Sequence, residues 1–186
     1  YSVVDQAGNM VAVTYTLNTN FGTGIVAAGT GILLNNEMDD FSAKPGVPNA
    51  YGLVGGAANA VAAGKRPLSS MTPTLVLKDQ QPWLVTGSPG GARIITTVLQ
   101  QIVNGIDFGM NPAEAAAAVR FHHQWMPDEL RVEKGFSPDT LHLLRQKGQN
   151  VVVKPAMGRT QTIQVQGQAL WGYSDPRNPD GLTLGY

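Results

Sequence analysis

The residues best suited to chemistry gather in two short loops rich in glycine, serine and proline. The loops are Ser69-Ser70-Met71-Thr72-Pro73 and Gly87-Ser88-Pro89-Gly90-Gly91-Ala92-Arg93. The second loop follows an apolar run that predicts a strand and leads into one that predicts a buried helix. Such a strand, glycine turn and helix leave backbone N–H groups facing open space, where they bind a phosphate, a carboxylate or a developing oxyanion. Gly90 and Gly91 let a ligand approach the backbone, although tight turns also use glycine for geometry alone.

Two carboxylates, Glu37 and Asp40, lie three residues apart in the polar group that follows the apolar run 32–34. Acids in this arrangement can bind a substrate ammonium through charge-assisted hydrogen bonds, or serve as acid and base. The alternative is a solvated acidic turn without a ligand.

Hydroxyl and amide side chains occur at two further places. Thr16 and Asn18 occupy alternate positions after an expected strand, so their side chains share one face. They either contact a ligand or complete the hydrogen bonding of the strand end. Ser69 and Ser70 can hold a carboxylate through hydroxyl and backbone donors, or they form an ordinary polar turn.

The histidines do not indicate a metal site. His122 and His123 are adjacent in a strand-like piece, so they point to opposite sides, and His142 lies in a charged helix without ligand spacing to them. We interpret the pair as packing and local hydrogen bonding. Ser88 lacks the nucleophile-elbow pattern. The absence of cysteine excludes disulfides and thiolate catalysis, and no cofactor is indicated.

Periodicity and turn residues predict the elements that must position these groups. The result is an α+β fold in a single domain, with largely antiparallel strands and helices packed on the sheet faces. A long Pro/Gly/Ala segment, residues 42–67, has no period and is typical of a lid or binding loop. The expected strands are 1–5, 9–16, 32–34, 74–78, 83–86, 151–153, 162–165 and 169–173, and the expected helices are 92–105, one starting at Asn111-Pro112, and one from Ser137 to Gln146.

The composition excludes several classes of partner. Charged residues make up 14% of the 186 residues and the formal net charge is +0, which argues against nucleic-acid or anionic-membrane binding. No apolar stretch approaches the roughly 20 residues that span a bilayer. A surface so poor in charge would suit burial against another subunit. Because Tyr1 already reads as strand, we expect a fragment or a processed product with no leader.

Four motifs, taken together, resemble one family. In order and with matching gaps, they are similar to the small subunit of γ-glutamyltranspeptidase over essentially the whole chain, most closely that of the bacterial periplasmic enzymes. The segments 120–125 and 174–177 also resemble this family. The motifs are Val13-Thr14-Tyr15-Thr16-Leu17-Asn18, residues 31–41 around Asn35-Asn36-Glu37-Met38-Asp39-Asp40, Lys65-Arg66-Pro67-Leu68-Ser69-Ser70-Met71, and Gly87-Ser88-Pro89-Gly90-Gly91.

The resemblance implies an N-terminal-nucleophile hydrolase with an αββα sandwich, of which residues 1–186 form the small subunit. A precursor would cut itself to expose a threonine nucleophile whose α-amine can act as base. That threonine is expected just before Tyr1, so the 186 residues alone should have no normal catalysis. The implied substrates are glutathione and related γ-glutamyl compounds, and the acceptors are water, amino acids and peptides. The implied partner is a large subunit, and the implied compartment is the periplasm or the outside of the cell.

The resemblance also assigns roles to residues at the start of the chain. Thr16 would hydrogen-bond the nucleophile. Asn18, Glu37 and Asp40 would bind the α-amino and α-carboxylate ends of the glutamyl group, with the acids taking the ammonium.

The remaining assigned roles concern the two loops and a lid. Ser69 and Ser70 would hold the α-carboxylate together with an arginine of the large subunit. Gly90 and Gly91 would supply the oxyanion-hole N–H groups. A lid at about 45–56 would cover the pocket, with Tyr51 as its gate.

Two alternatives to the transpeptidase remain open. A glutaryl-cephalosporin-type acylase would share the motifs, but its substrate lacks the ammonium and would leave the acids unpaired. A non-catalytic amino-acid-binding or assembly subunit would account for the absent nucleophile.

Overall fold

A computed structural model describes residues 1–185. The chain forms two compact units. Unit 1 consists of Tyr1–Thr14 together with the chain from Met71 onward, and unit 2 consists of Tyr15–Ser70.

A four-stranded antiparallel sheet is the framework of unit 1. Its strands are β3 (Thr74–Lys78), β4 (Gln81–Thr86), β8 (Gln161–Gln166) and β9 (Ala169–Ser174), in the order β3-β4-β8-β9. Both hairpins were expected from the sequence, and the register pairs Val85 with Leu75 on one side and Ile163 on the other. Val85 is fully buried as a result.

The expected N-terminal hairpin also forms. β1 (Ser2–Val4) pairs with β2 (Met10–Ala12), and the Asp5 carboxylate closes the turn by accepting from the Asn9 N–H at 2.8 Å. The Ser2 hydroxyl donates to the Gln161 carbonyl at 2.7 Å, which attaches the hairpin to β8.

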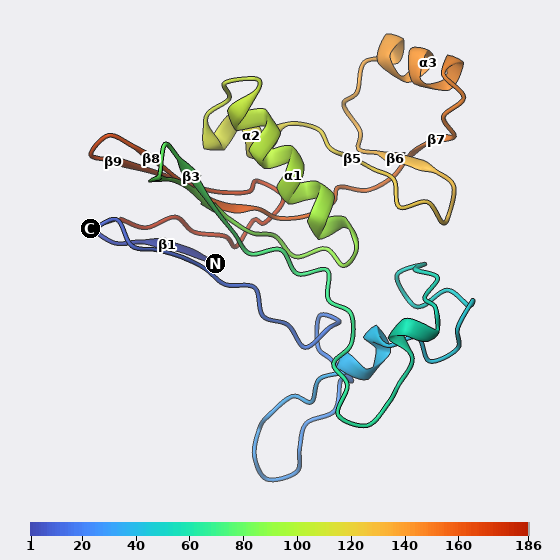
Figure 1. The fold of residues 1–186 in the computed structure, drawn as a ribbon. Coiled ribbons are helices and arrows are strands. Elements are labelled where there is room, and N and C mark those ends of the chain that lie inside the picture. The colour runs from blue at the N-terminus through green and yellow to red at the C-terminus, as the bar shows by residue number, and fades with distance from the viewer. Residues whose placement is uncertain (186) are drawn as a thin grey trace. The chain divides into compact units, whose positions relative to one another are not determined.

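Two helices cover one face of the four-stranded sheet (Figure 1). Helix α1 (Arg93–Ile106) buries Ile94 and Val98 toward the sheet. Helix α2 (Pro112–Ala117) begins at Asn111, whose side chain accepts from the N–H groups of Ala113 and Glu114 while Glu114 accepts from Asn111 in return. This reciprocal cap and the proline at the first helical position explain why the sequence predicted this start.

A second, three-stranded sheet contains β5 (Phe121–His122), β6 (Leu130–Val132) and β7 (Val151–Val153). β6 pairs in parallel with β7, and α3 (Pro138–Gln146) lies between them in sequence. Strand β6 was not expected from the sequence, because a segment of three residues is too short to show the alternating pattern of a strand.

Four charged side chains, three of them buried, connect distant parts of unit 1. Arg120 forms an ion pair with Asp175 at 2.5 Å, and Arg177 bridges Glu133 at 2.5 Å and Asp175 at 3.2 Å. The side chain of Asp175 has no exposed surface. Burial by itself raises the pKa of Asp175, but Arg120 and the hydrogen bonds it accepts outweigh this effect and lower that pKa below its usual value.

Unit 2 has little regular structure. It contains two short 3-10 helices, η1 (Glu37–Asp40) and η2 (Ala57–Asn59). The buried strand expected at 32–34 is wrong: the segment forms one isolated bridge, Val26 with Leu33, and Ile32 is 62% exposed. Apolar composition alone predicted burial there, but the segment has no neighbouring strand of its own length to pair with.

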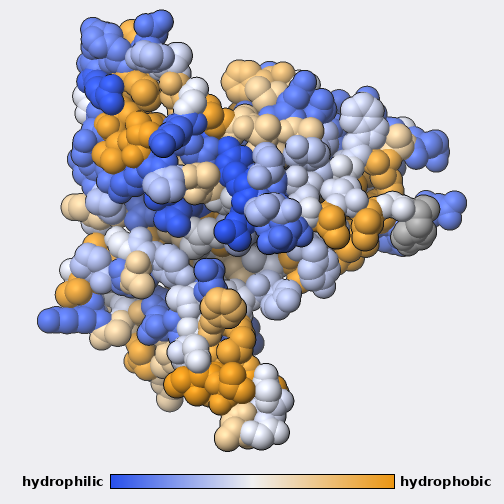
Figure 2. All heavy atoms as spheres, turned by 180° about the vertical axis from the view of Figure 1, so that it is seen from behind, coloured by the Kyte–Doolittle hydropathy of each residue, from blue (hydrophilic) through white to orange (hydrophobic). Residues whose placement is uncertain are grey.

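The loop 23–34 instead folds back on itself, with Ala27 donating to Ile32 and Leu34 donating to Ile25. Hydrophobic side chains cover its surface, and Figure 2 shows them as an orange group at the lower edge of the view. Within residues 1–185, no helix is long and apolar enough to cross a bilayer.

Candidate functional site

Hydrogen bonds in unit 2 bring three of the predicted site residues together. The Thr16 hydroxyl accepts from the Asn18 N–H at 2.7 Å, and the Tyr51 hydroxyl reaches the Asn18 carbonyl at 3.1 Å and its side-chain oxygen at 3.0 Å. Asn18 has φ +80°, a left-handed conformation that asparagine tolerates better than most residues. Its side-chain NH₂ donates to the Asn36 carbonyl at 3.1 Å, directly before η1.

Helix η1 places the two acids next to each other. Side chains three residues apart eclipse in a 3-10 helix, so Glu37 and Asp40 lie on the same side of η1. Burial raises the pKa of Glu37, and the hydrogen bond and charge of Asp40 raise it further. Burial also raises the pKa of Asp40, and the charge of Asp39 adds to this, while the hydrogen bond to Glu37 opposes it.

Neither Glu37 nor Asp40 takes part in an ion pair within the described chain. Two neighbouring, partly buried carboxyl groups without a cation are unfavourable when both are charged. A bound ammonium group would neutralise them and donate hydrogen bonds to both. The arrangement can therefore accommodate a cation.

Asn59 was not singled out from the sequence, although it connects this site to the serine loop. Its side-chain NH₂ donates to the Asp40 carbonyl at 2.7 Å, and its side-chain oxygen accepts from the Leu68 N–H at 2.9 Å. Leu68 directly precedes Ser69 and Ser70, so one side chain ties the serine loop to the end of η1. An asparagine in a segment without period gives no sequence signal for such a role.

The expected lid is an ordered loop that carries Tyr51 at its tip. Pro48 forms a bridge with Val54, and the Asn49 side chain accepts from the N–H groups of Tyr51 and Leu53 at 2.9 and 3.0 Å. These bonds hold the Tyr51 backbone while its hydroxyl contacts Asn18.

The diglycine loop of unit 1 joins β4 to α1, as the sequence predicted. Gly90 and Gly91 have φ values of +145° and +60°, which side chains with a Cβ rarely adopt. Their carbonyls accept from the Arg93 and Ile94 N–H groups at 3.3 and 3.0 Å, so the loop runs into the first turn of α1. Their own N–H groups have no hydrogen-bond partner within residues 1–185. Two free donors at a helix start can bind an anionic oxygen.

The predicted site residues thus fall into two groups. Thr16, Asn18 and Tyr51 share one hydrogen-bond network in unit 2, and Asn36 connects that network to the start of η1. Asn59 in turn connects the end of η1 to the serine loop. Gly90 and Gly91 belong to unit 1.

The histidine pair packs as expected. His122 is buried between the Thr96 hydroxyl at 2.8 Å and the Gln124 side chain at 2.9 Å, and burial lowers its pKa. His123 points to solvent and contacts Asp128 at 3.1 Å. No group of three potential metal ligands occurs in the described part of the chain.

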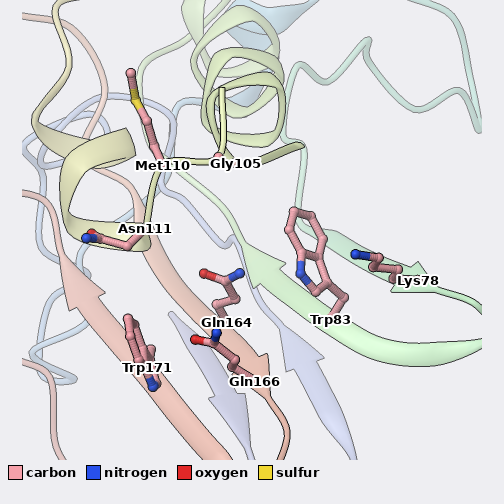
Figure 3. A pocket seen from close by; sticks show the side chains of 9 residues that line it. Lys78, Trp83, Gly105, Met110, Asn111, Gln164, Gln166 and Trp171 are labelled. Carbon is pink, nitrogen blue, oxygen red and sulfur yellow. The ribbon is translucent and has the colours of Figure 1, made fainter. Parts of the chain in front are cut away.

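A pocket of about 330 Å³ lies at the other end of α1, roughly 20 Å along that helix from Gly91. Figure 3 shows Gln164 and Gln166 on its floor, with the rings of Trp83 and Trp171 to either side. A β-bulge inserts Trp83 as the extra residue of β4 and turns it toward this side of the sheet. None of the residues lining this pocket was predicted from the sequence to belong to a site.

A four-stranded antiparallel sheet covered by two helices, with free amides where β4 enters α1, agrees in fold with solved structures of one class. This is part of an N-terminal-nucleophile hydrolase fold. The sequence model of the family Gamma-glutamyltranspeptidase matches residues 1–184, and the chain belongs to this family.

Curated relatives agree with this assignment. The chain is 73% identical over 187 residues to the glutathione hydrolase proenzyme of Escherichia coli K12, covering 100% of this chain and 32% of that protein. It is 49% identical over 197 residues to the glutathione hydrolase proenzyme of Pseudomonas sp. strain A14, covering 100% of this chain and 34% of that protein. The chain therefore spans about a third of the length of the curated relatives it matches.

Solved structures confirm the fold. A Helicobacter pylori γ-glutamyltranspeptidase T380A mutant superposes with a TM-score of 0.94 at 57% identity, covering 96% of this chain and 98% of that chain. A cephalosporin acylase from Bacillus halodurans superposes with a TM-score of 0.81 at 31% identity, covering 95% of this chain and 32% of that chain.

Proposed function

We propose that this chain is the small subunit of a periplasmic or secreted γ-glutamyltransferase and glutathione hydrolase, completed by a large subunit from the same precursor. The observation that carries the proposal is the partly buried Glu37–Asp40 pair, which has no cation in the described chain. A γ-glutamyl group brings an α-ammonium to such a site. Family membership and the short coverage of the proenzymes support the partner.

In the proposed reaction, the acids hold the ammonium while Ser69 and Ser70 hold the α-carboxylate. The threonine hydroxyl expected upstream of Tyr1 loses its proton to the α-amine and adds to the γ-carbonyl carbon. The π electrons move onto the carbonyl oxygen, which the Gly90 and Gly91 N–H groups stabilise. Collapse breaks the amide bond, the amine leaves with the proton, and a γ-glutamyl ester remains. Water or an acceptor amine then releases the glutamyl group through a second tetrahedral state.

Activity of the complete two-subunit protein tests this proposal. We expect release of nitroaniline from a γ-glutamyl nitroanilide, and faster release when glycylglycine is added as acceptor. Mass spectrometry must first show that the small subunit begins with threonine. An intact, correctly processed complex without release would contradict the proposal.

A glutaryl acylase is the second candidate, favoured by the superposition on the cephalosporin acylase. The substrates of the two candidates differ at one group, because a glutaryl amide has hydrogen in place of the α-ammonium of a γ-glutamyl amide. Comparing kcat/KM for glutaryl and γ-glutamyl versions of the same anilide separates the two. A preference for the glutaryl amide would favour the acylase.

A further inference from the structure

We infer that Ser88 is a positioning residue that aims the Gly90 N–H at the reacting carbonyl oxygen. This inference rests on the proposed function and assigns a task to a side chain outside the proposed contacts with substrate. It begins from the geometry of the two peptide units that carry the free donors.

The Gly90 N–H belongs to the Pro89–Gly90 peptide unit. A trans peptide is planar, and its C=O and N–H point in opposite directions. This peptide is trans, since Met126-Pro127 is the cis bond found in the described chain. The direction of the Gly90 N–H is therefore fixed by whatever holds the Pro89 carbonyl.

The Ser88 hydroxyl holds that carbonyl. It donates to the Pro89 oxygen at 2.8 Å and accepts from the Arg159 N–H at 2.9 Å. Ser88 is 3% exposed, so water does not compete freely for these bonds. Because the Arg159 N–H is itself a donor and cannot accept the hydroxyl proton, that proton is directed at the Pro89 oxygen.

The residues beside Ser88 hold it in place. Gly158 lies so close that a Cβ there would stand 3.0 Å from the Ser88 hydroxyl and 2.6 Å from the Thr97 methyl group. The segment that contains Gly158 is itself fixed, because Arg120 donates to the Met157 carbonyl at 2.8 Å and Asp175 accepts from the Thr160 N–H at 2.9 Å. The buried ion network thus supports the segment against which Ser88 packs.

The second donor is held differently. The Gly91 N–H belongs to the Gly90–Gly91 peptide, whose carbonyl accepts from the Arg93 N–H at 3.3 Å. That partner is a backbone group in the first turn of α1, which no side-chain substitution other than proline removes. One donor is therefore set by a side chain and the other by the helix start.

The test compares Ser88→Ala with Thr162→Val in the complete two-subunit protein. Thr162→Val is the matched control, since it removes a buried hydroxyl bond of 2.8 Å to Thr86 without touching the diglycine loop. Rates are expressed per processed molecule, counted from the intact mass of the small subunit. Removal of a whole oxyanion-hole donor costs about 10²–10³ in kcat. Ser88→Ala keeps the Gly90 N–H but no longer fixes its direction. We therefore expect kcat to fall about 10- to 100-fold, with KM changed less than about threefold.

A second measurement separates aiming from general damage. A boronic-acid analogue of glutamate becomes tetrahedral and anionic when the nucleophile adds to it, whereas glutamate itself stays planar at its γ-carboxyl group. Ser88→Ala should weaken the boronate by about the same factor as kcat and leave glutamate affinity within about threefold. Thr162→Val should leave both affinities unchanged. Should Ser88→Ala not mature, Ser88→Cys replaces it, because a thiol is a weak donor of similar shape, and its kcat should fall less.

The outcomes distinguish the two proposals. An active wild-type protein whose Ser88→Ala variant behaves like Thr162→Val, or loses boronate and glutamate affinity equally, would overturn the role of Ser88 alone. A correctly processed wild-type protein without γ-glutamyl activity would overturn the proposed function, and the inference with it.

Discussion

Glu37 and Asp40 compete for protons because η1 holds them together. Burial raises the pKa of both carboxyl groups; Asp40 raises the pKa of Glu37 further, and the charge of Asp39 adds to the rise at Asp40. A ligand ammonium has the opposite effect, since it favours two charged carboxylates. Ligand binding and deprotonation of the pair are therefore linked.

This linkage predicts the pH dependence of substrate binding. The pKa values rise above ordinary values of 4.5 for Glu37 and 3.8 for Asp40, so protonation begins at a higher pH than for a solvated acid. As the pH falls through the raised values, the pair loses charge and KM for a γ-glutamyl amide should increase. KM for the glutaryl amide should not increase in this way. A γ-glutamyl KM that stays flat or decreases over this range would contradict the cation site.

Asp40→Asn tests the same site at constant pH. The substitution removes one charge and keeps a similar shape. A hydrogen bond to a charged group is worth about 1.5–3 kcal/mol, so kcat/KM for the γ-glutamyl anilide should fall about 10- to 100-fold. The glutaryl anilide should lose less than about threefold. Asp107→Asn is the control, because Asp107 is exposed at the end of α1, in the other unit. Equal losses on both substrates would argue against an ammonium contact.

The sequence predicted the spacing of these acids but not their environment. Their separation of three residues suggested a shared role, whereas burial and the missing counter-ion depend on the surrounding loops. The connection through Asn59 depends on a hydrogen bond between segments far apart in sequence. Likewise, the glycine pair indicated free amides, but nothing in the sequence showed that Ser88 aims one of them.

The buried ion network ties separate elements together. Glu133 follows β6, Asp175 follows β9, and Arg120 lies between α2 and β5. Each charge is satisfied by another, so removing one leaves the others buried without a partner. Breaking a buried pair in this way costs about 3–5 kcal/mol.

Asp175→Asn should therefore strongly destabilise the protein, which a lower Tm of the two-subunit protein would show. Because the pKa of Asp175 is lowered in the folded state, its contribution is present above the usual value of 3.8 and is lost as the pH falls through the lower folded value. The Tm of the wild type should fall as the pH is lowered through that range. The Tm of Asp175→Asn should fall by a smaller amount over the same range. Asp139→Asn, at the exposed start of α3, is the control and should change Tm little. A variant as stable as wild type would contradict the network's role.

Elements with local signals were predictable, and those without were not. Helices α2 and α3 begin at a cap followed by proline, which specifies them within a few residues. Strand β6 depends on a parallel partner that follows a helix in the sequence, so no local pattern marks it. The segment 32–34 shows the opposite case, since its apolar residues have no sheet to join.

At the scale of the whole molecule, exposed hydrophobic side chains exceed what an isolated chain usually tolerates. They include Ile25, Ile32 and Tyr15 in unit 2 and Phe108 and Trp171 in unit 1. The proposed large subunit would cover part of this surface. The low net charge offers little repulsion between copies.

The isolated chain should therefore self-associate and bind a hydrophobic dye, whereas the two-subunit protein should do neither. Size-exclusion chromatography and dye fluorescence at equal concentrations of both preparations check this expectation. Circular dichroism confirms that the isolated chain is folded in the sample. A folded, monomeric chain that does not bind the dye would contradict it.

The two ends of unit 2 leave and rejoin unit 1 beside the same residue. A Cβ at Gly87 would lie 3.4 Å from the Thr14 hydroxyl and 3.9 Å from the Cα of Pro73. The intervening chain is thus an insertion between neighbouring anchor points, and a short linker could bridge them. Replacing residues 15–70 by such a linker would leave the strands of both sheets, α1 and the diglycine turn unchanged in sequence.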